Sequence, residues 1–239
     1  MPVEEAVLVR ELREPFADLL SLVEKRPSMR VLDMSSGPAE LTHEMQKLLA
    51  AREMIRFREE PLTARGNRIC KRSGTGDDRT GAERYDLIVS TAPLQLISDH
   101  RSALRTLTEC LREGGQLALQ MPANGDHPAN TIAAQVARQF GLEPRPMNVL
   151  WLDAYAELLF SLGFKRQQVR LQVYGRLLQS PAELVECVRD TILAPYESSL
   201  APATVEHFLR AYGDELHDSI PPSSPYFFAD KRLLIWASL

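Results

Sequence analysis

The segment Arg30–Ala39, with the sequence RVLDMSSGPA, predicts the fold of this chain. Val31–Met34 is a short apolar run typical of a buried strand, and a helix is expected to begin near Glu40. A tight turn that connects a strand to a helix suits a nucleotide-type cofactor bound at the carboxyl end of the strand. The turn has a single glycine, Gly37, so it has little of the backbone freedom that such turns usually require.

Strand-like and helix-like segments alternate along the rest of the chain. Strands are expected at residues 54–57, 86–90, 116–121, 168–173 and 233–237, with a weak one near Cys70. Helices are expected at residues 15–25, 41–49, 104–111, 131–140, 152–162, 180–188 and 204–216. The helix of residues 104–111 is expected to stop at Gly114–Gly115, and Ser180–Glu183 has the pattern of a capping box. This alternation predicts an α/β fold, with a mostly parallel sheet covered on both faces.

The composition limits the classes of protein and partner. The 239 residues are 44% hydrophobic and have a net charge of −4, which is enough for one sizeable core but gives no basic surface for nucleic acid or an anionic membrane. No apolar run approaches the roughly 18 residues that a membrane span needs. There is no CxxC zinc pair, so no metal site is predicted. The acidic N-terminus lacks a secretory pattern, which predicts a cytoplasmic protein.

The strand–turn–helix segment resembles motif I of the class I S-adenosylmethionine-dependent methyltransferases, whose approximate sequence is VLDxGCGPG. The matching residues are Val31, Leu32, Asp33, Gly37 and Pro38. Ser35 and Ala39 stand where the motif has glycine, and Ser36 stands where it has cysteine.

Longer segments resemble the trans-aconitate methyltransferases. Tyr85–His100 (YDLIVSTAPLQLISDH) resembles their DLIxxNAxLQWxPDH segment, and Gly114–Asn124 (GGQLALQMPAN) resembles GGxLAVQMPDN. Arg13–Leu20 (REPFADLL) resembles RPxxDLL, and Val185–Thr191 (VECVRDT) resembles VEWVKGT. The resemblance covers nearly the whole chain. The malonyl-carrier-protein methyltransferases share this layout and are the second family to consider.

The resemblance implies a single domain with a seven-stranded, mostly parallel Rossmann-like sheet and helices on both faces. The core is expected at about residues 10–140, 164–174 and 226–239. A helical lid near the C-terminus is expected at about residues 142–162 and 180–222.

The implied reaction is methyl transfer from S-adenosylmethionine to a carboxylate oxygen of a small molecule or of a carrier-bound acyl acceptor. Such a reaction depends mainly on proximity and orientation, and a general base is not required. Two alternatives stay open because several cofactor contacts are substituted. In the first alternative, the chain is a cofactor-impaired homologue that acts as a non-catalytic partner or binding protein. In the second alternative, it is an enzyme that binds the cofactor but does not methylate. A homo- or hetero-oligomer is compatible with each hypothesis.

The resemblance also assigns residues to the cofactor. Asp33, Ser35 and Gly37 of the motif I turn are expected near the amino-acid end of S-adenosylmethionine. Ser35 is compatible with this turn if its φ is negative. Glu59 is the expected ligand of the ribose hydroxyls, and the segment after the strand at residues 86–90 contributes Ser90 and Thr91 at the methionine end.

The remaining site residues are assigned to catalysis and to the acceptor. The expected catalytic residues are Gln95 and His100, although Asp99 and His100 also have the pattern of a helix N-terminus. The expected substrate-binding residues are Tyr155, Tyr174, Arg176 and Tyr196, because carboxylates are recognised by cations and hydroxyl groups. A position in the protein core is the alternative for Tyr155.

Overall fold

The computed structural model describes most of the chain, and contacts divide it into two compact units. The described residues are 14–35, 39–56, 84–91, 94–145, 147–220 and 225–239. The first unit consists of Met1–Pro122, Asn148–Gln172 and Arg232–Leu239, and the second unit consists of Ala123–Met147 and Val173–Lys231.

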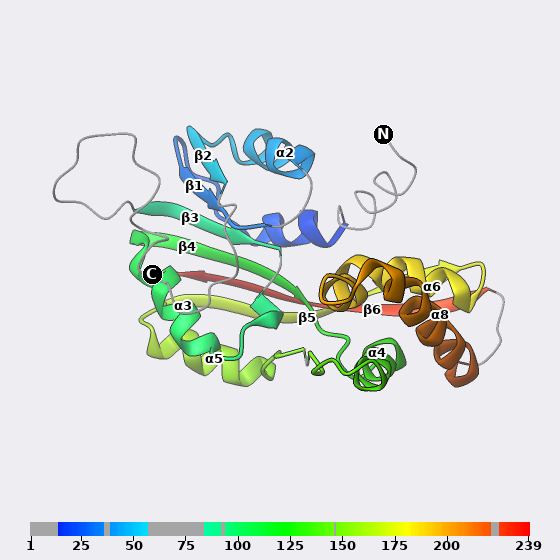
Figure 1. Ribbon diagram of the computed structural model, residues 1–239. Coiled ribbons are helices and arrows are strands. Elements are labelled where there is room, and N and C mark those ends of the chain that lie inside the picture. The colour runs from blue at the N-terminus through cyan, green and yellow to red at the C-terminus, as the bar shows by residue number, and fades with distance from the viewer. Residues whose placement is uncertain (1–13, 36–38, 57–83, 92–93, 146, 221–224) are drawn as a thin grey trace. The chain divides into compact units, whose positions relative to one another are not determined.

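The six described strands form one mixed sheet (Figure 1). The strands are β1 (Arg30–Asp33), β2 (Glu53–Arg56), β3 (Tyr85–Ser90), β4 (Leu111–Pro122), β5 (Arg166–Leu178) and β6 (Tyr226–Ser238). Their order is β2-β1-β3-β4-β6-β5. β1 pairs in parallel with β2 and β3, β3 pairs in parallel with β4, and β4 pairs antiparallel with β6. The α/β fold is therefore confirmed, whereas the seventh strand expected near Cys70 lies outside the described residues.

Helices cover both faces of the sheet in the first unit (Figure 1). The labelled elements are α2 (Ala39–Leu49), the short 3₁₀ helix η2 (Leu94–Leu96), α3 (His100–Glu109) and α5 (Leu152–Ser161). A further helix runs through residues 14–22. This helix and α2 lie on one face of the sheet, and α3 and α5 lie on the other.

The core under α2 is built from alternate residues of four strands. Its strand residues are Val31, Leu87, Val89, Ala118, Leu234 and Trp236, and its helix residues include Phe16, Leu19, Leu20, Leu41, Met45 and Leu49. Because successive strand residues point to opposite faces, these residues identify which side of each strand is turned toward α2.

The end of α3 and the start of β4 differ from the expectation. The helix ends at Glu109, and β4 begins at Leu111, so Gly114–Gly115 lies inside the strand instead of stopping the helix. Tyr85 pairs with Leu111, but the next aligned pair is Leu87 with Gln116. Gly114 has a φ of +69°, which is a left-handed backbone conformation. The sequence pattern predicted this conformation at the end of a helix, but in the structure it belongs to a bulge in β4.

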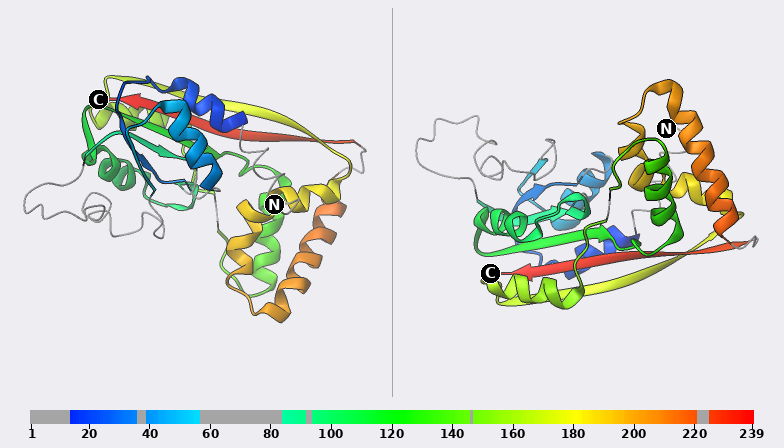
Figure 2. Two further views of the ribbon diagram at one scale, coloured as in Figure 1. Left: turned by 90° about the horizontal axis from the view of Figure 1, so that it is seen from above. Right: turned by 60° about the horizontal axis from the view of Figure 1, so that its bottom comes forward.

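The second unit is built around the helices of the C-terminal half. They are α4 (Pro128–Gln139), α6 (Pro181–Val188), the π-helix η3 (Arg189–Leu193), α7 (Ala194–Glu197) and α8 (Pro202–Ser219). Figure 2 shows α4 in green, α6 in yellow and α8 in orange gathered together. Their core includes Ile132, Val136, Leu184, Val188, Tyr196, Phe208, Tyr212 and Leu216.

The capping box at the start of α6 is only half formed. Ser180 is the N-cap, but its side chain makes no capping hydrogen bond. Glu183 does reach back, because its carboxylate accepts a hydrogen bond of 2.9 Å from the backbone N–H of Gln179. The expected pattern therefore located the helix start correctly, but the serine half of its hydrogen bonding was wrong.

The boundaries between the two units differ from the boundaries between the core and the lid that were expected from the sequence. The lid segment at residues 142–162 contains α5, which belongs to the first unit, and the core segment at residues 10–140 contains α4, which belongs to the second.

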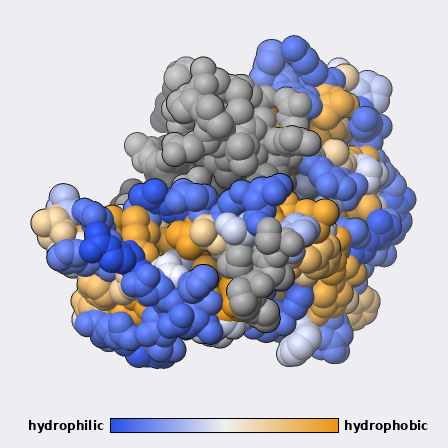
Figure 3. Space-filling view, turned by 90° about the vertical axis from the view of Figure 1, so that its right-hand side faces the viewer, coloured by the Kyte–Doolittle hydropathy of each residue, from blue (hydrophilic) through white to orange (hydrophobic). Residues whose placement is uncertain are grey.

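Several large apolar side chains are exposed on the surface. Trp151 and Phe160 are strongly exposed at α5, and Leu177 and Phe227 are exposed on β5 and β6. On the face shown in Figure 3, hydrophobic residues lie in separate patches bordered by hydrophilic ones. Among the described residues, no helix is long and apolar enough to cross a membrane.

Candidate functional site

The strand order creates a switch point between β1 and β3. From β1 the chain leads outward to β2, and it then returns to the other side of β1 as β3. In open α/β sheets, ligands bind outside the carboxyl ends of the strands at such a point. The carboxyl ends of β1 and β3 and the residues that follow them are therefore the first place to look for a site. The expected residues Asp33, Ser35, Ser90 and Thr91 lie there.

Asp33 holds the turn after β1. It is fully buried, and its Oδ1 accepts a hydrogen bond of 2.9 Å from the backbone N–H of Ser35. Its Oδ2 accepts a hydrogen bond of 2.6 Å from the hydroxyl of Thr42 on α2. Both oxygens of this carboxylate thus bind groups of the chain itself, so Asp33 fixes the path from the strand into α2.

Ser35 links the two strands of the switch point. Its hydroxyl oxygen accepts a hydrogen bond of 3.2 Å from the backbone N–H of Thr91, which follows β3. Among the described non-glycine residues, only Ser28 and Ala50 have a positive φ. Ser35 therefore occupies the glycine position of the motif without backbone strain, which was the condition for a serine to be compatible with this turn.

Gln95 follows β3 in η2. Its backbone carbonyl accepts a hydrogen bond of 2.8 Å from the N–H of Asn148. Its side chain is buried, and the Oε1 atom has no hydrogen-bond partner among the described residues. A buried acceptor of this kind costs about 1–3 kcal/mol unless a ligand or water satisfies it.

Asp99 and His100 form the start of α3, as the alternative interpretation predicted. Asp99 caps the helix by accepting a hydrogen bond of 3.0 Å from the backbone N–H of Ser102. The His100 side chain turns inward, and its Nδ1 lies 2.8 Å from the hydroxyl of Tyr155 on α5. That hydroxyl is also 3.4 Å from Met121 Sδ. Tyr155 therefore lies in the core of the first unit, where it connects α5 to α3 and β4.

Burial keeps the side chains of His100 and Tyr155 uncharged. It lowers the pKa of His100, although the backbone carbonyls of Ile97 and Asn148 favour the protonated form and oppose the shift. Burial also raises the pKa of Tyr155 to about 12, against a hydrogen bond from the backbone of Leu150. A neutral imidazole beside a neutral phenol positions the two helices and places no net charge in the core.

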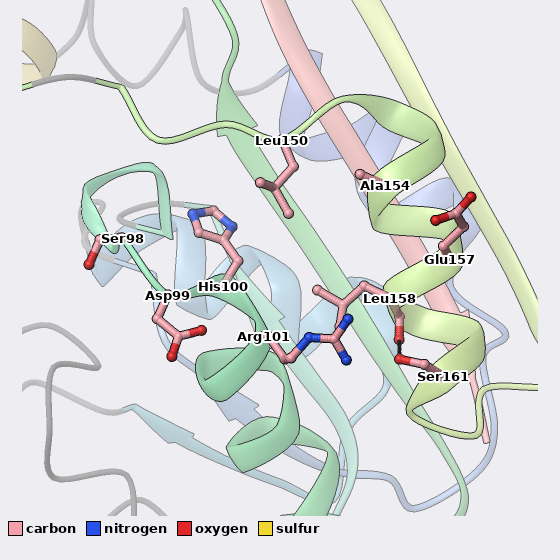
Figure 4. A pocket seen from close by; sticks show the side chains of 9 residues that line it. All are labelled: Ser98, Asp99, His100, Arg101, Leu150, Ala154, Glu157, Leu158 and Ser161. Carbon is pink, nitrogen blue, oxygen red and sulfur yellow. Dashed lines mark hydrogen bonds between the residues drawn. The ribbon is translucent and has the colours of Figure 1, made fainter.

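A pocket of about 500 Å³ opens between the start of α3 and α5 (Figure 4). It is lined by Ser98, Asp99, His100, Arg101, Leu150, Ala154, Glu157, Leu158 and Ser161. These helices lie on the face of the sheet opposite α2, so the pocket is separate from the turn that contains Ser35.

Gln120 on β4 is a buried polar residue that was not among the expected site residues. Its side chain is 1% exposed, and neither Oε1 nor Nε2 has a hydrogen-bond partner among the described residues. Ser90 pairs with Leu119, so Gln120 is level with Thr91 at the carboxyl edge of the sheet. The signal was available in the segment GGQLALQMPAN, where a polar residue interrupts an apolar strand.

Three expected substrate residues, Tyr174, Arg176 and Tyr196, lie in the second unit. The guanidinium of Arg176 forms an ion pair of 2.9 Å with Asp230, and their side chains are 14% and 4% exposed. Asn124 donates a further hydrogen bond of 3.1 Å to the same carboxylate. The charge of Arg176 is thus balanced inside its own unit.

Both tyrosines of this set are buried. The hydroxyl of Tyr196 accepts a hydrogen bond of 2.7 Å from the backbone N–H of Arg145, within the second unit. The two remaining expected cofactor residues, Gly37 and Glu59, lie outside the described residues.

Comparison with known proteins identifies the family. The family described as "Methyltransferase domain" matches residues 8–169, which is more than half of the chain. This chain belongs to that methyltransferase family. The expected class I S-adenosylmethionine-dependent methyltransferase is therefore confirmed as the enzyme class, and S-adenosylmethionine as the cofactor of that class.

Relatives of this methyltransferase-family chain match along almost its whole length. The trans-aconitate 2-methyltransferase of Deinococcus radiodurans is 30% identical over 235 residues, covering 92% of this chain and 91% of that protein. The trans-aconitate 2-methyltransferase of Streptomyces avermitilis is 30% identical over 227 residues, covering 87% and 84%. The resemblance drawn from the sequence segments is thus confirmed.

Solved structures agree on the fold of this methyltransferase-family chain. The YcgJ protein from Bacillus subtilis has a TM-score of 0.50 at 14% identity and covers 95% of this chain and 98% of its own. The mycolic acid cyclopropane synthase CmaA1 has a TM-score of 0.51 at 11% identity and covers 95% and 83%. At these identities the likeness shows the Rossmann-like fold alone.

Proposed function

We propose that this protein is an O-methyltransferase that uses S-adenosylmethionine to esterify a small carboxylic acid. The observation that carries the proposal is the placement of Ser35 and Thr91 at the switch point of the sheet. The buried Oε1 of Gln95, in the segment that follows β3, has no hydrogen-bond partner in the part of the chain that the structure describes. The relatives named trans-aconitate 2-methyltransferase support a carboxylic acid as the acceptor.

The residues around the switch point are compatible with the cofactor. The turn after β1 accepts Ser35 without strain, and Asp33 fixes the turn through two hydrogen bonds. We assign the methionine end of the cofactor to this turn, together with Gly37, with Ser90 at the end of β3 and with Thr91 directly after it. Glu59 is retained as the proposed ribose ligand because of the resemblance.

When bound, S-adenosylmethionine supplies an electrophilic methyl group for one in-line substitution by an acceptor oxygen. A carboxylate is already ionised at neutral pH, so the chain is not required to remove a proton. His100 is neutral, buried and bonded to Tyr155, and its role in this proposal is to position α3 and the segment that carries Gln95. Gln95 contributes a hydrogen-bonding group rather than a base.

The proposal also includes the number of strands, the helical lid and the acceptor residues that were expected from the sequence. The resemblance supports a seven-stranded sheet and a helical lid made from residues 142–162 and 180–222. Tyr174, Arg176 and Tyr196 lie in the second unit, which contains most of that lid. We retain their assignment to the acceptor, with a carrier-bound acyl group as the second type of acceptor.

A product assay tests the proposal. The protein is incubated with S-adenosylmethionine and a panel of trans-aconitate, citrate, malonate and hexanoate, and both S-adenosylhomocysteine and the methyl ester are measured by mass spectrometry. Equal amounts of the two products with one of these acids are expected. S-adenosylhomocysteine without an ester would favour other chemistry on the cofactor, and a protein that binds no cofactor would favour a non-catalytic partner.

A further inference from the structure

The N-terminus of α4 is capped by a histidine. His127 has extended backbone angles, with a φ of −73° and a ψ of 140°, and Pro128 follows it as the first residue of the helix. Its Nδ1 accepts a hydrogen bond of 3.1 Å from the backbone N–H of Ala129, and its carbonyl accepts one of 2.9 Å from the N–H of Asn130. Helices are usually capped by a side-chain oxygen, which does not take up a proton near neutral pH. The cap of α4 is instead a ring nitrogen that titrates in this range.

The contacts of the His127 ring define its neutral form. Since Nδ1 accepts a hydrogen bond, the proton of the neutral ring is on Nε2, which lies 3.3 Å from the hydroxyl of Tyr226 on β6 and donates to it. The ring also packs edge-on against Phe228, with 5.1 Å between the ring centroids and 79° between the planes. The second unit therefore holds this ring between α4 and β6 in one tautomer.

The turn that His127 caps belongs to the core of the second unit. Ala129 is 1% exposed and lies in the core that α4 shares with α8. The carbonyl of Ala129 accepts a hydrogen bond of 3.2 Å from the hydroxyl of Tyr212 on α8. The N–H of this residue thus binds the cap, and its carbonyl binds the neighbouring helix.

A proton on Nδ1 is incompatible with the cap. The protonated ring has a donor at each nitrogen, so Nδ1–H would face the N–H of Ala129 without an acceptor between them. The positive charge would also lie at the N-terminus of a 12-residue helix, where the helix dipole opposes it. The bond from Nε2 to Tyr226 needs a donor in both states, so it does not oppose protonation.

We propose that His127 is a proton-operated cap of α4, in which the neutral ring closes the first turn and the uptake of one proton from solvent at Nδ1 opens it. Burial lowers the pKa of His127, so the closed turn resists the proton and an opened turn accepts it more readily. The turn is therefore closed at neutral pH and opens as the pH falls below the value of about 6.5 for an exposed histidine.

The charged groups near the ring are paired with one another. Asp126, which favours protonation of the ring, is 2.6 Å from the ammonium group of Lys231, which opposes it. On the face of β6 that carries Phe228, Asp230 is 2.9 Å from the guanidinium of Arg176. The first turn of α4 has no acidic residue.

The two hydroxyl groups near the capped turn are uncharged. Burial raises the pKa of Tyr212 on α8 and of Tyr226 on β6 above the usual value for tyrosine. Neither tyrosine therefore takes part in a change between neutral and mildly acidic pH, and the titration of the cap depends on the histidine.

Hydrogen exchange of the Ala129 amide measures the closure of the turn. Protection, corrected for the intrinsic exchange rate, is compared by NMR at about pH 7.5 and about pH 5.5. In wild type it should fall by up to about tenfold, because the opened turn takes up one proton over the pH unit below about 6.5. The amide of Val136, in the middle of the same helix, should change less, which distinguishes local opening from global unfolding.

Substitutions of the cap separate titration from capping. In His127→Asn the side-chain oxygen caps the helix without titrating, so the protection of Ala129 should be the same at both pH values. In His127→Ala the protection should be low at both, because the cap is absent. His207→Asn, at an exposed position on α8, is the matched control and should behave like wild type.

The ring nitrogens give a second measurement that needs no variant. Their chemical shifts in isotope-labelled wild type at about pH 7.5 should show a proton on Nε2 of His127 and none on Nδ1. A proton on Nδ1 at that pH would overturn the inference. So would unchanged protection of Ala129 in wild type, an equal loss of protection at Ala129 and Val136, or the same pH dependence in wild type and His127→Asn.

Discussion

The hydroxyl of Ser35 accepts a hydrogen bond of 3.2 Å from the backbone N–H of Thr91, and this bond joins the ends of β1 and β3. A glycine at position 35 could not form it. The departure from the glycine of motif I therefore adds a connection across the switch point and does not distort the turn. The serine substitution, which in the sequence suggested an impaired cofactor site, is structurally compatible with a formed one.

This contact predicts a stability effect. Ser35→Ala should lower the free energy of unfolding by about 1 kcal/mol, because it removes the acceptor of the Thr91 N–H. For a chain of this size, that corresponds to a Tm decrease of about 2–4 °C. Ser98→Ala, at an exposed position before α3, serves as the control and should change Tm little. Equal Tm values for the two variants would show that the link contributes nothing to stability.

The buried His100 and the half-buried His127 predict a loss of stability at acidic pH. Burial lowers the pKa of His100 below the value of about 6.5 for an unfolded histidine, so the unfolded state takes up the proton first as the pH falls. Stability is therefore lost as the pH falls below about 6.5, until the pKa of the folded state is passed. Burial also lowers the pKa of His127, which contributes in the same direction.

Urea unfolding at about pH 7.5 and about pH 5.5 measures this loss. It should be smaller in His100→Gln than in wild type, whereas His217→Gln, at an exposed position on α8, serves as the control. A loss that is identical in wild type and His100→Gln would mean that His100 does not resist protonation.

The ion pair between Arg176 and Asp230 predicts that this arginine stabilises the second unit, in addition to the role toward the acceptor that is proposed for it. Arg176→Met leaves a buried carboxylate without its cation, which should cost about 3–5 kcal/mol in urea unfolding. Arg170→Met, at an exposed position of the same strand, should cost less than about 0.5 kcal/mol. Equal stability of the two variants would contradict this stabilising role, and weaker acid binding by Arg176→Met alone would support the proposed role of Arg176 toward the acceptor.

Much of the fold could be predicted because its signals are local. The apolar run at Val31–Met34 and the alternation of strands and helices were sufficient for the α/β class and for most of the element positions. The helix stop assigned to Gly114–Gly115 was wrong because a positive φ suits a strand bulge as well as a helix end. The choice between these two depends on the pairing of β4 with β3, which a local pattern does not contain.

The candidate site could be predicted only in part. Motif I indicated Asp33 and Ser35, and the resemblance around the strand at residues 86–90 indicated Thr91. The structure brings these residues to the switch point. Gln120 was not predicted because what distinguishes it is the absence of a tertiary partner among the described residues. The partner of Arg176 was likewise not predictable, since Asp230 is 54 residues away in the sequence.

Calorimetric titration of the wild-type protein with S-adenosylhomocysteine decides whether the turn joined by Ser35 and Thr91 forms a working cofactor site. We expect saturable binding of one ligand per chain, an increase in Tm with ligand concentration, and weaker binding in Glu59→Gln. The absence of both heat and a Tm shift at millimolar ligand would contradict this expectation and would identify the chain as a family member that has lost its cofactor.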